Sequence, residues 1–120
     1  MDKVSNSKQY NLEERTLRFA QQVIEFIKPL PKNVQNIEIS KQLVRSSSSV
    51  GANYIEANES LSRKDFVMRI KICRKESKES GYWLKLIEVK TDNEEQKRTD
   101  LIDEATQLTK IFSSIVEKSQ

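Results

Sequence analysis

"RSSSSVGANYIEAN", residues 45–58, is the stretch that decides the fold. Four consecutive serines and a glycine are typical of a flexible linker, yet apolar residues flank them at regular intervals. Steps of four and three residues connect one series of positions: Leu43, Ser47, Val50, Tyr54, Ala57 and Leu61. A linker has no reason to keep this phase, so the spacing predicts a helix that begins near Asn36 or Ile37. Serine and glycine are poor helix formers, and Gly51 costs about 1 kcal/mol relative to alanine. Tertiary packing must therefore stabilise this helix.

Three other segments repeat the same period, which predicts four long amphipathic helices. The first opens at Asn11, which has capping-box spacing to a glutamate, and it is stopped by Pro29. The third opens at Ser62 and runs to about Lys90, and the fourth opens at Asp92. The core positions expected in these three helices are Leu12, Thr16, Phe19, Ala20, Val23, Ile24, Phe26 and Ile27; Phe66, Ile70, Cys73, Ser77, Ser80, Leu84 and Ile87; and Leu101, Ala105, Leu108, Phe112 and Ile115.

An apolar period near 3.5 residues is typical of helices that pack at shallow angles in a left-handed bundle. Short connections near residues 28–36, 61–63 and 91–94 predict that neighbouring helices are antiparallel. The expected fold class is all-α, an antiparallel up-down-up-down left-handed four-helix bundle. We expect residues 11–120 to form this single domain and residues 1–10 to form a disordered or poorly ordered tail.

The composition fits a small cytoplasmic protein. The chain has 120 residues, enough for one domain with a real core, and a single cysteine, which has no partner for an internal disulfide. No apolar run approaches the ~18 residues of a membrane helix, and the first residues lack the apolar stretch of a signal peptide. We therefore expect a cytoplasmic protein with no membrane association.

Positive charge is concentrated in one segment. Residues 61–90 contain nine Lys and Arg against four acids, whereas the rest of the chain has twelve against fourteen. A solvated helix face is one interpretation of this run. The other is a surface that binds phosphate backbones with little sequence preference. The candidate nucleic-acid-binding residues are Arg45, Arg63, Lys64, Arg69, Lys71, Arg74, Lys75 and Lys78.

Small residues at the seam of the second and third helices predict that these two helices pack closely. Gly51 and Ala52 lie off that seam and are expected to admit a second chain. Tyr82 and Trp83 also lie off the core stripe. They are candidates for a protomer interface, for apolar cover at the bundle edge, or for base stacking.

Catalytic and metal-binding patterns are absent from the sequence. The chain has no histidine and one thiol, so the glutamate pairs at helical spacing lack the histidines of di-iron bundles. There is also no glycine-rich phosphate loop and no nucleophile elbow. We expect no catalytic residue, no metal and no cofactor, and hence a protein that is not an enzyme.

The run "QLVRSSSSVGANYIEAN", residues 42–58, followed by "SRKDFVMRIKICRKESKESGYWLKL", closely resembles the four-helix-bundle family named for rRNA intervening sequences. The family pattern is Gln-Leu-x-Arg-(small)₂-x-Ser-(aliphatic)-x-Ala-Asn-x-x-Glu, then a Ser-x-x-(Asp/Glu)-Phe helix start and a glutamate on the third helix. The matching positions are Gln42, Leu43, Arg45, Ser46, Ser49, Val50, Ala52, Asn53, Glu56, Ser62, Asp65, Phe66 and Glu79. A glycine often follows the last glutamate of the first pattern in the family, whereas Ala57 stands there in this chain.

The resemblance implies a small cytoplasmic bacterial protein that assembles as a homopentamer. Related bundles are accessory factors of diversity-generating retroelements, in which a basic pentameric barrel binds nucleic acid and a reverse transcriptase. Asn53, Glu56 and Glu79 match polar positions of the family. We interpret them as structural groups that link helices, with Arg45 as a partner.

Two functions follow. The first is a non-enzymatic oligomer that binds RNA or DNA through a basic surface centred on the third helix and Arg45. The alternative is an oligomeric scaffold that binds another protein, such as a reverse transcriptase, and whose charge serves only solubility.

Overall fold

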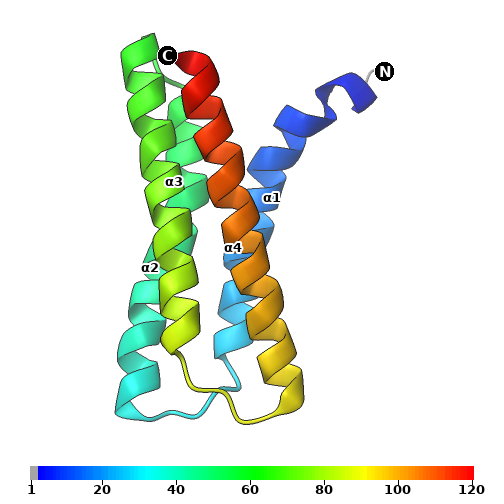
Figure 1. Cartoon of the computed structure of the whole chain (residues 1–120), viewed down its shortest axis with the longest axis vertical. Coiled ribbons are helices and arrows are strands. Elements are labelled where there is room, and N and C mark those ends of the chain that lie inside the picture. Colours follow the sequence, from blue (N-terminus) through cyan, green and yellow to red (C-terminus); the bar gives the residue numbers. More distant parts are fainter. Residues whose placement is uncertain (1–2) are drawn as a thin grey trace.

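The computed structural model describes the backbone from Lys3 and the side chains from Leu12 to Gln120. Four helices make up this part of the chain: α1 (Lys3–Ile27), α2 (Val34–Asn58), α3 (Arg63–Leu86) and α4 (Asp92–Ser119). Successive helices run in opposite directions, and α2 packs against both α1 and α3 (Figure 1). The all-α bundle expected from the sequence is confirmed, and its left-handed sense stays a prediction. The tail expected at residues 1–10 lies outside the residues whose side chains are described.

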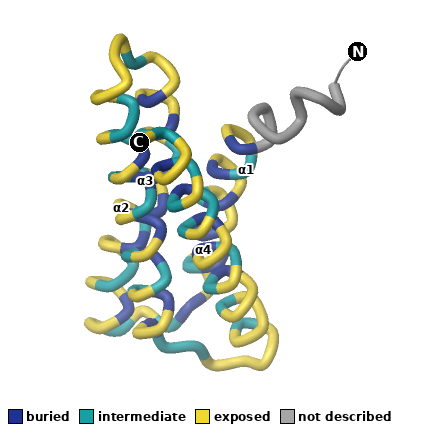
Figure 2. Tube along the Cα trace, turned by 45° about the horizontal axis from the view of Figure 1, so that its top comes forward, coloured by how far each residue is buried: buried dark blue, intermediate teal, exposed yellow. Residues whose placement is uncertain are grey.

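The serine-rich stretch is helical throughout, as its apolar phase predicted. Buried residues form a stripe along the inward side of each helix (Figure 2). The core predicted for α1 and α2 is largely confirmed, with Leu43 and Val50 fully buried. Leu61 is the clear error, since it is 99% exposed. The helix ends at Asn58, so the spacing that pointed to this leucine no longer describes the backbone there.

Hydroxyl groups let α2 and α3 approach closely. Ser46 and Ser80 are both fully buried, and their Oγ atoms lie 2.9 Å apart. The pair has two hydrogens, so one serine donates to the other and the second donates to a carbonyl of its own helix, either Glu76 at 2.9 Å from Ser80 or Leu43 at 3.3 Å from Ser46. The thiol of Cys73 donates to the carbonyl of Val50 at 3.4 Å. These contacts confirm the close packing that small residues predicted for this pair of helices.

The helix ends are set by capping residues. Ser62 caps α3 and accepts a hydrogen bond from the Asp65 amide at 3.1 Å, as predicted. The cap of α4 is Thr91, one residue before the predicted Asp92, and it accepts from the Glu94 amide. α3 stops at Leu86, before the predicted end near Lys90, because the next residue has an extended backbone.

Helix starts and five further core positions also differ from the prediction, three of which, Ala20, Ile27 and Phe66, are only partly buried. α1 begins at Lys3, and α2 begins at Val34, both earlier than the spacing indicated. Ile24 is 39% exposed instead of buried, because it lies toward the outer edge of the stripe. In α4, Ile115 is only partly buried and Val116 takes the core position.

Asn36 hydrogen-bonds to both the connection between α1 and α2 and the connection between α3 and α4, which meet at one end of the bundle. Its amide nitrogen donates to the carbonyls of Pro31 and Glu88, at 3.1 and 2.9 Å. Its Oδ1 atom accepts from the Glu88 amide at 2.8 Å. The side chain is buried, and it joins the start of α2 to the end of α3.

Candidate nucleic-acid interface

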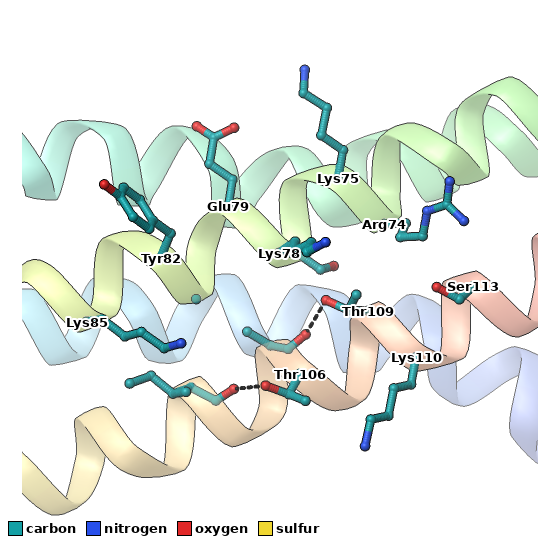
Figure 3. A pocket seen from close by; sticks show the side chains of 14 residues that line it. Arg74, Lys75, Lys78, Glu79, Tyr82, Lys85, Thr106, Thr109, Lys110 and Ser113 are labelled. Atoms are coloured by element: carbon teal, nitrogen blue, oxygen red, sulfur yellow. Dashed lines mark hydrogen bonds between the residues drawn. The ribbon is translucent and has the colours of Figure 1, made fainter.

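Three basic residues of α3 lie on the side that faces α4. Arg74, Lys78 and Lys85 are separated by four and seven residues, which places them on one helix face. All three line a groove of about 1000 Å³ between α3 and α4. Lys75 from α3 and Lys110 from α4 complete the set of basic groups around it (Figure 3).

Small residues hollow out the floor of this groove. Ser77 and Ala105 are buried beneath it, and Gly81 approaches Ala105 so closely that an added Cβ would lie 3.7 Å from the alanine Cβ. On the α4 side, the wall carries the hydroxyls of Thr106, Thr109 and Ser113. The Thr106 and Thr109 hydroxyls bond to carbonyls of their own helix, and Figure 3 shows both bonds.

The charge around the groove is almost entirely positive. Within residues 12–120, no carboxylate forms an ion pair with any of the five basic side chains. The one acid in the lining, Glu79, is paired instead with Arg45 of α2. We call this cavity the basic groove. Its five basic residues are Arg74, Lys75, Lys78, Lys85 and Lys110.

Two residues predicted to bind nucleic acid have polar partners where α2 packs against α3. Arg45 forms ion pairs with Glu76, at 3.2 Å, and with Glu79. Arg69 donates to the Oδ1 atom of Asn53 at 2.9 Å. Both guanidinium groups tie α2 to α3 and neither lines the groove, and their contact with nucleic acid stays a prediction.

The other predicted basic residues are in the N-terminal half of α3. Arg63 donates to the carbonyl of Ser119 at 2.8 Å, where it satisfies the end of α4. Lys64 and Lys71 are exposed but do not line the groove. Three of the predicted residues therefore line the groove together: Arg74, Lys75 and Lys78.

The groove also contains residues that the sequence did not single out. Lys85 follows Lys78 by seven residues, and that spacing is visible in the sequence. Lys110 carries no such pattern, because only the packing of α4 against α3 brings it to the groove.

The predicted polar links between helices are confirmed at two of three positions. Asn53 accepts from Arg69 and also donates to the Ser49 carbonyl at 2.9 Å. Glu79 accepts from both Arg45 and the Trp83 indole. Glu56 is exposed, and its side chain makes no hydrogen bond to residues 12–120, so it does not link helices within this part of the chain.

Gly51 has a role within its own chain. A Cβ atom at this position would lie 3.0 Å from the Oγ1 atom of Thr16 in α1. The glycine therefore admits α1, which corrects the expectation that it faces a second chain. Ala52, beside it, is exposed.

The two adjacent aromatic residues of α3 differ in burial. Tyr82 is 58% exposed, whereas Trp83 is half-buried and packs against the core. The Trp83 indole donates to Glu79 at 3.1 Å, and the two rings meet edge to face with centroids 5.3 Å apart. Tyr82 lines the basic groove.

The described residues offer no alternative chemical centre. Among residues 12–120 there is no group of three side chains that would hold a metal ion. Burial raises the pKa of the Cys73 thiol to about 12, which keeps it protonated and poorly nucleophilic at neutral pH. Within the same part of the chain, no helix is long and apolar enough to cross a membrane.

Comparisons with known proteins agree with this architecture. A crystal structure from Bacteroides thetaiotaomicron, of a protein of unknown function from the S23 ribosomal protein family, is 32% identical. It aligns with a TM-score of 0.76 over 87% of this chain and 96% of that chain. No curated protein matches the chain. The pattern of the 23S rRNA-intervening sequence protein family matches residues 8–114, and the chain belongs to that family.

Proposed function

We propose that the protein binds nucleic acid through the basic groove and has no catalytic activity. The observation that supports this proposal is the charge of the groove: five basic residues line it, although the ends of Lys75 and Lys110 point away from its centre (Figure 3), and none is paired with a carboxylate of residues 12–120. An acid at i+3 or i+4 that paired with such a side chain would offset its charge. Here the only acid of the lining is held by Arg45.

Phosphate is the ligand that this arrangement fits best. Lysine and arginine nitrogens bind phosphate oxygens and release condensed counterions, which supplies affinity without sequence preference. The family name refers to intervening sequences of 23S rRNA, which supports RNA as the first nucleic acid to test. A cytoplasmic location is part of the same proposal.

Salt dependence is the direct test. If all five groups contact phosphates, log Kd against log salt should have a slope of about 3.5 for a single strand. Affinity should then fall about 100-fold between about 50 and 200 mM salt. Fluorescence anisotropy with labelled RNA and DNA measures both quantities.

Charge-matched variants separate the groove from net charge. Replacing Arg74, Lys78 and Lys85 with glutamine should lower the slope by about 2 and weaken binding at low salt. The control replaces three exposed lysines outside the groove with glutamine: Lys28, Lys41 and Lys118. The proposal fails if RNA and DNA do not bind at low salt, or if the two triple variants bind equally well.

We also propose that the chain assembles with copies of itself, for which the family resemblance suggests five. Exposed apolar side chains on α1 and α2 support a protein contact on the face away from the basic groove. They are Leu17 and Ile24 of α1, and Ile37 and Ile55 of α2, each between 39% and 57% exposed. Native mass spectrometry would give the number of copies. Aspartate at Leu17 and Ile55 should dissociate the assembly, and a wild-type protein that is monomeric at micromolar concentration would contradict the proposal.

A scaffold that binds another protein, such as a reverse transcriptase, is the competing function. The same apolar side chains on α1 and α2 favour it. It becomes the better account if nucleic acid fails to bind while the assembly is intact.

A further inference from the structure

Tyr82 is placed among the basic residues of the groove, although it is not itself charged. It follows Lys78 by four residues and precedes Lys85 by three, so all three side chains share one face of α3. Its side chain is 58% exposed, which is unusual for an aromatic residue that has a core within reach. In Figure 3 the ring projects from the side of α3 that also carries Glu79, whereas Lys85 extends toward α4.

The ring is supported from behind by a chain of contacts. Trp83 meets it edge to face at 5.3 Å. Trp83 is in turn fixed by packing against the core and by its hydrogen bond to Glu79. Glu79 accepts from Arg45 of α2, so the support extends to the neighbouring helix. An exposed ring that is held in this way loses little conformational entropy when a flat ligand stacks on it.

We infer that the basic groove binds single-stranded nucleic acid in preference to a duplex, with an unpaired base stacked on Tyr82. The inference rests on the proposed function, because it concerns the same groove. Lys78 and Lys85 precede and follow Tyr82 along α3 and are about 10 Å apart along the helix axis, a separation that suits the phosphates flanking a stacked base. In a duplex both faces of every internal base are covered by neighbours, and only an unpaired base offers a face to a side chain.

The floor of the groove fits this mode of binding. Gly81 and Ala105 keep the hollow between α3 and α4 open beside Tyr82. A single flexible strand can follow such a hollow between two packed helices. A stiff duplex would touch only the outer ends of the lysine side chains.

The test compares single-stranded and duplex probes with three variants. Tyr82→Ala should weaken binding of a labelled single strand by about 5- to 100-fold, which is the usual contribution of one stacked base. Tyr82→Phe should keep most of the affinity, because it retains the ring. Met68→Ala is the matched control, since Met68 is an apolar side chain of α3 that is 49% exposed outside the groove, and it should bind like wild type.

The duplex of the same sequence should bind all four proteins with affinities within about twofold of one another, because it contacts only the cations. RNA and DNA strands are tested separately, since stacking needs only a π-face and the 2′-hydroxyl would distinguish them. The single tryptophan, Trp83, provides a second measurement: stacking on Tyr82 should change its emission in wild type and Tyr82→Phe.

The outcomes distinguish the two proposals. If neither probe binds wild type at low salt, the proposed function and this inference both fail. If both probes bind but Tyr82→Ala loses nothing, or loses single strand and duplex equally, only the stacking inference fails. It also fails if Tyr82→Ala changes the oligomeric state in native mass spectrometry, because Tyr82 then belongs to an interface between copies.

Discussion

Gly51 is where helix propensity and packing oppose each other most directly. An alanine would stabilise α2 by about 1 kcal/mol, since glycine is the poorer helix former. Its Cβ atom, however, would lie 3.0 Å from Oγ1 and 3.3 Å from Cβ of Thr16. Thr16 is buried and β-branched, so it has little freedom to move aside. Overpacking of this kind costs about 1–3 kcal/mol. Gly51→Ala is therefore expected to be neutral or to destabilise the protein by up to about 2 kcal/mol.

A double-mutant cycle isolates the contact. Thr16→Ala removes the Oγ1 atom that would lie nearest to the new methyl group and leaves the contacts with Cβ at 3.3 Å and with the backbone carbonyl carbon at 3.7 Å. In that background Gly51→Ala should be at least about 1 kcal/mol more favourable than in wild type. Urea unfolding at fixed protein concentration, followed by circular dichroism, gives the four free energies of unfolding.

Gly81 supplies the matched control, because it is also a glycine within a helix. A Cβ atom there would meet only the Ala105 Cβ at 3.7 Å, an ordinary contact. Gly81→Ala should stabilise the protein by about 0.5–1 kcal/mol. The packing argument is refuted if Gly51→Ala stabilises as much as Gly81→Ala, or if its effect is the same with and without the Thr16 hydroxyl.

Three further predictions concern buried polar groups. Asn36→Ala leaves backbone groups of Pro31 and Glu88 without their hydrogen-bond partner, so the free energy of unfolding should fall by about 2–4 kcal/mol. The control is Gln35→Ala at the neighbouring exposed position, and an equal loss of stability in both variants would contradict the role of Asn36. Arg45→Gln leaves the Glu76 carboxylate, whose side chain is only 9% exposed, without an ion-pair partner, and should lower the free energy of unfolding by about 1–3 kcal/mol. Lys41→Gln, which removes an exposed ion pair, should lower it by less than about 0.5 kcal/mol. Cys73 should resist a thiol reagent such as DTNB until the protein unfolds, and fast labelling of the native state would disprove its burial. Burial raises the pKa of the Cys73 thiol from 9.0 to about 12, so the thiol of the unfolded chain loses its proton at a lower pH than that of the folded chain. The free energy of unfolding should therefore be unaffected by this group below pH 9 and should fall above it by up to about 1.4 kcal/mol per pH unit.

The basic groove was only partly predictable. Net charge in residues 61–90 pointed to α3, and three of the residues proposed there, Arg74, Lys75 and Lys78, line the groove. The sequence did not show that Arg45 and Arg69 are held by polar groups across the contact between α2 and α3, because that contact joins residues far apart in the chain. Lys110 was missed for the same reason, since it reaches the groove from a different helix.

The sequence by itself determined the four helices and most of the core, because period and capping are local properties that backbone geometry converts directly into one buried stripe. It predicted the Ser62 cap correctly, and it placed the serine-rich stretch in a helix despite poor propensity. Only the tertiary structure decided which cations remain unpaired and what Gly51 faces. Those outcomes depend on which residues of other helices come within a few ångströms, and spacing along one chain does not encode that distance.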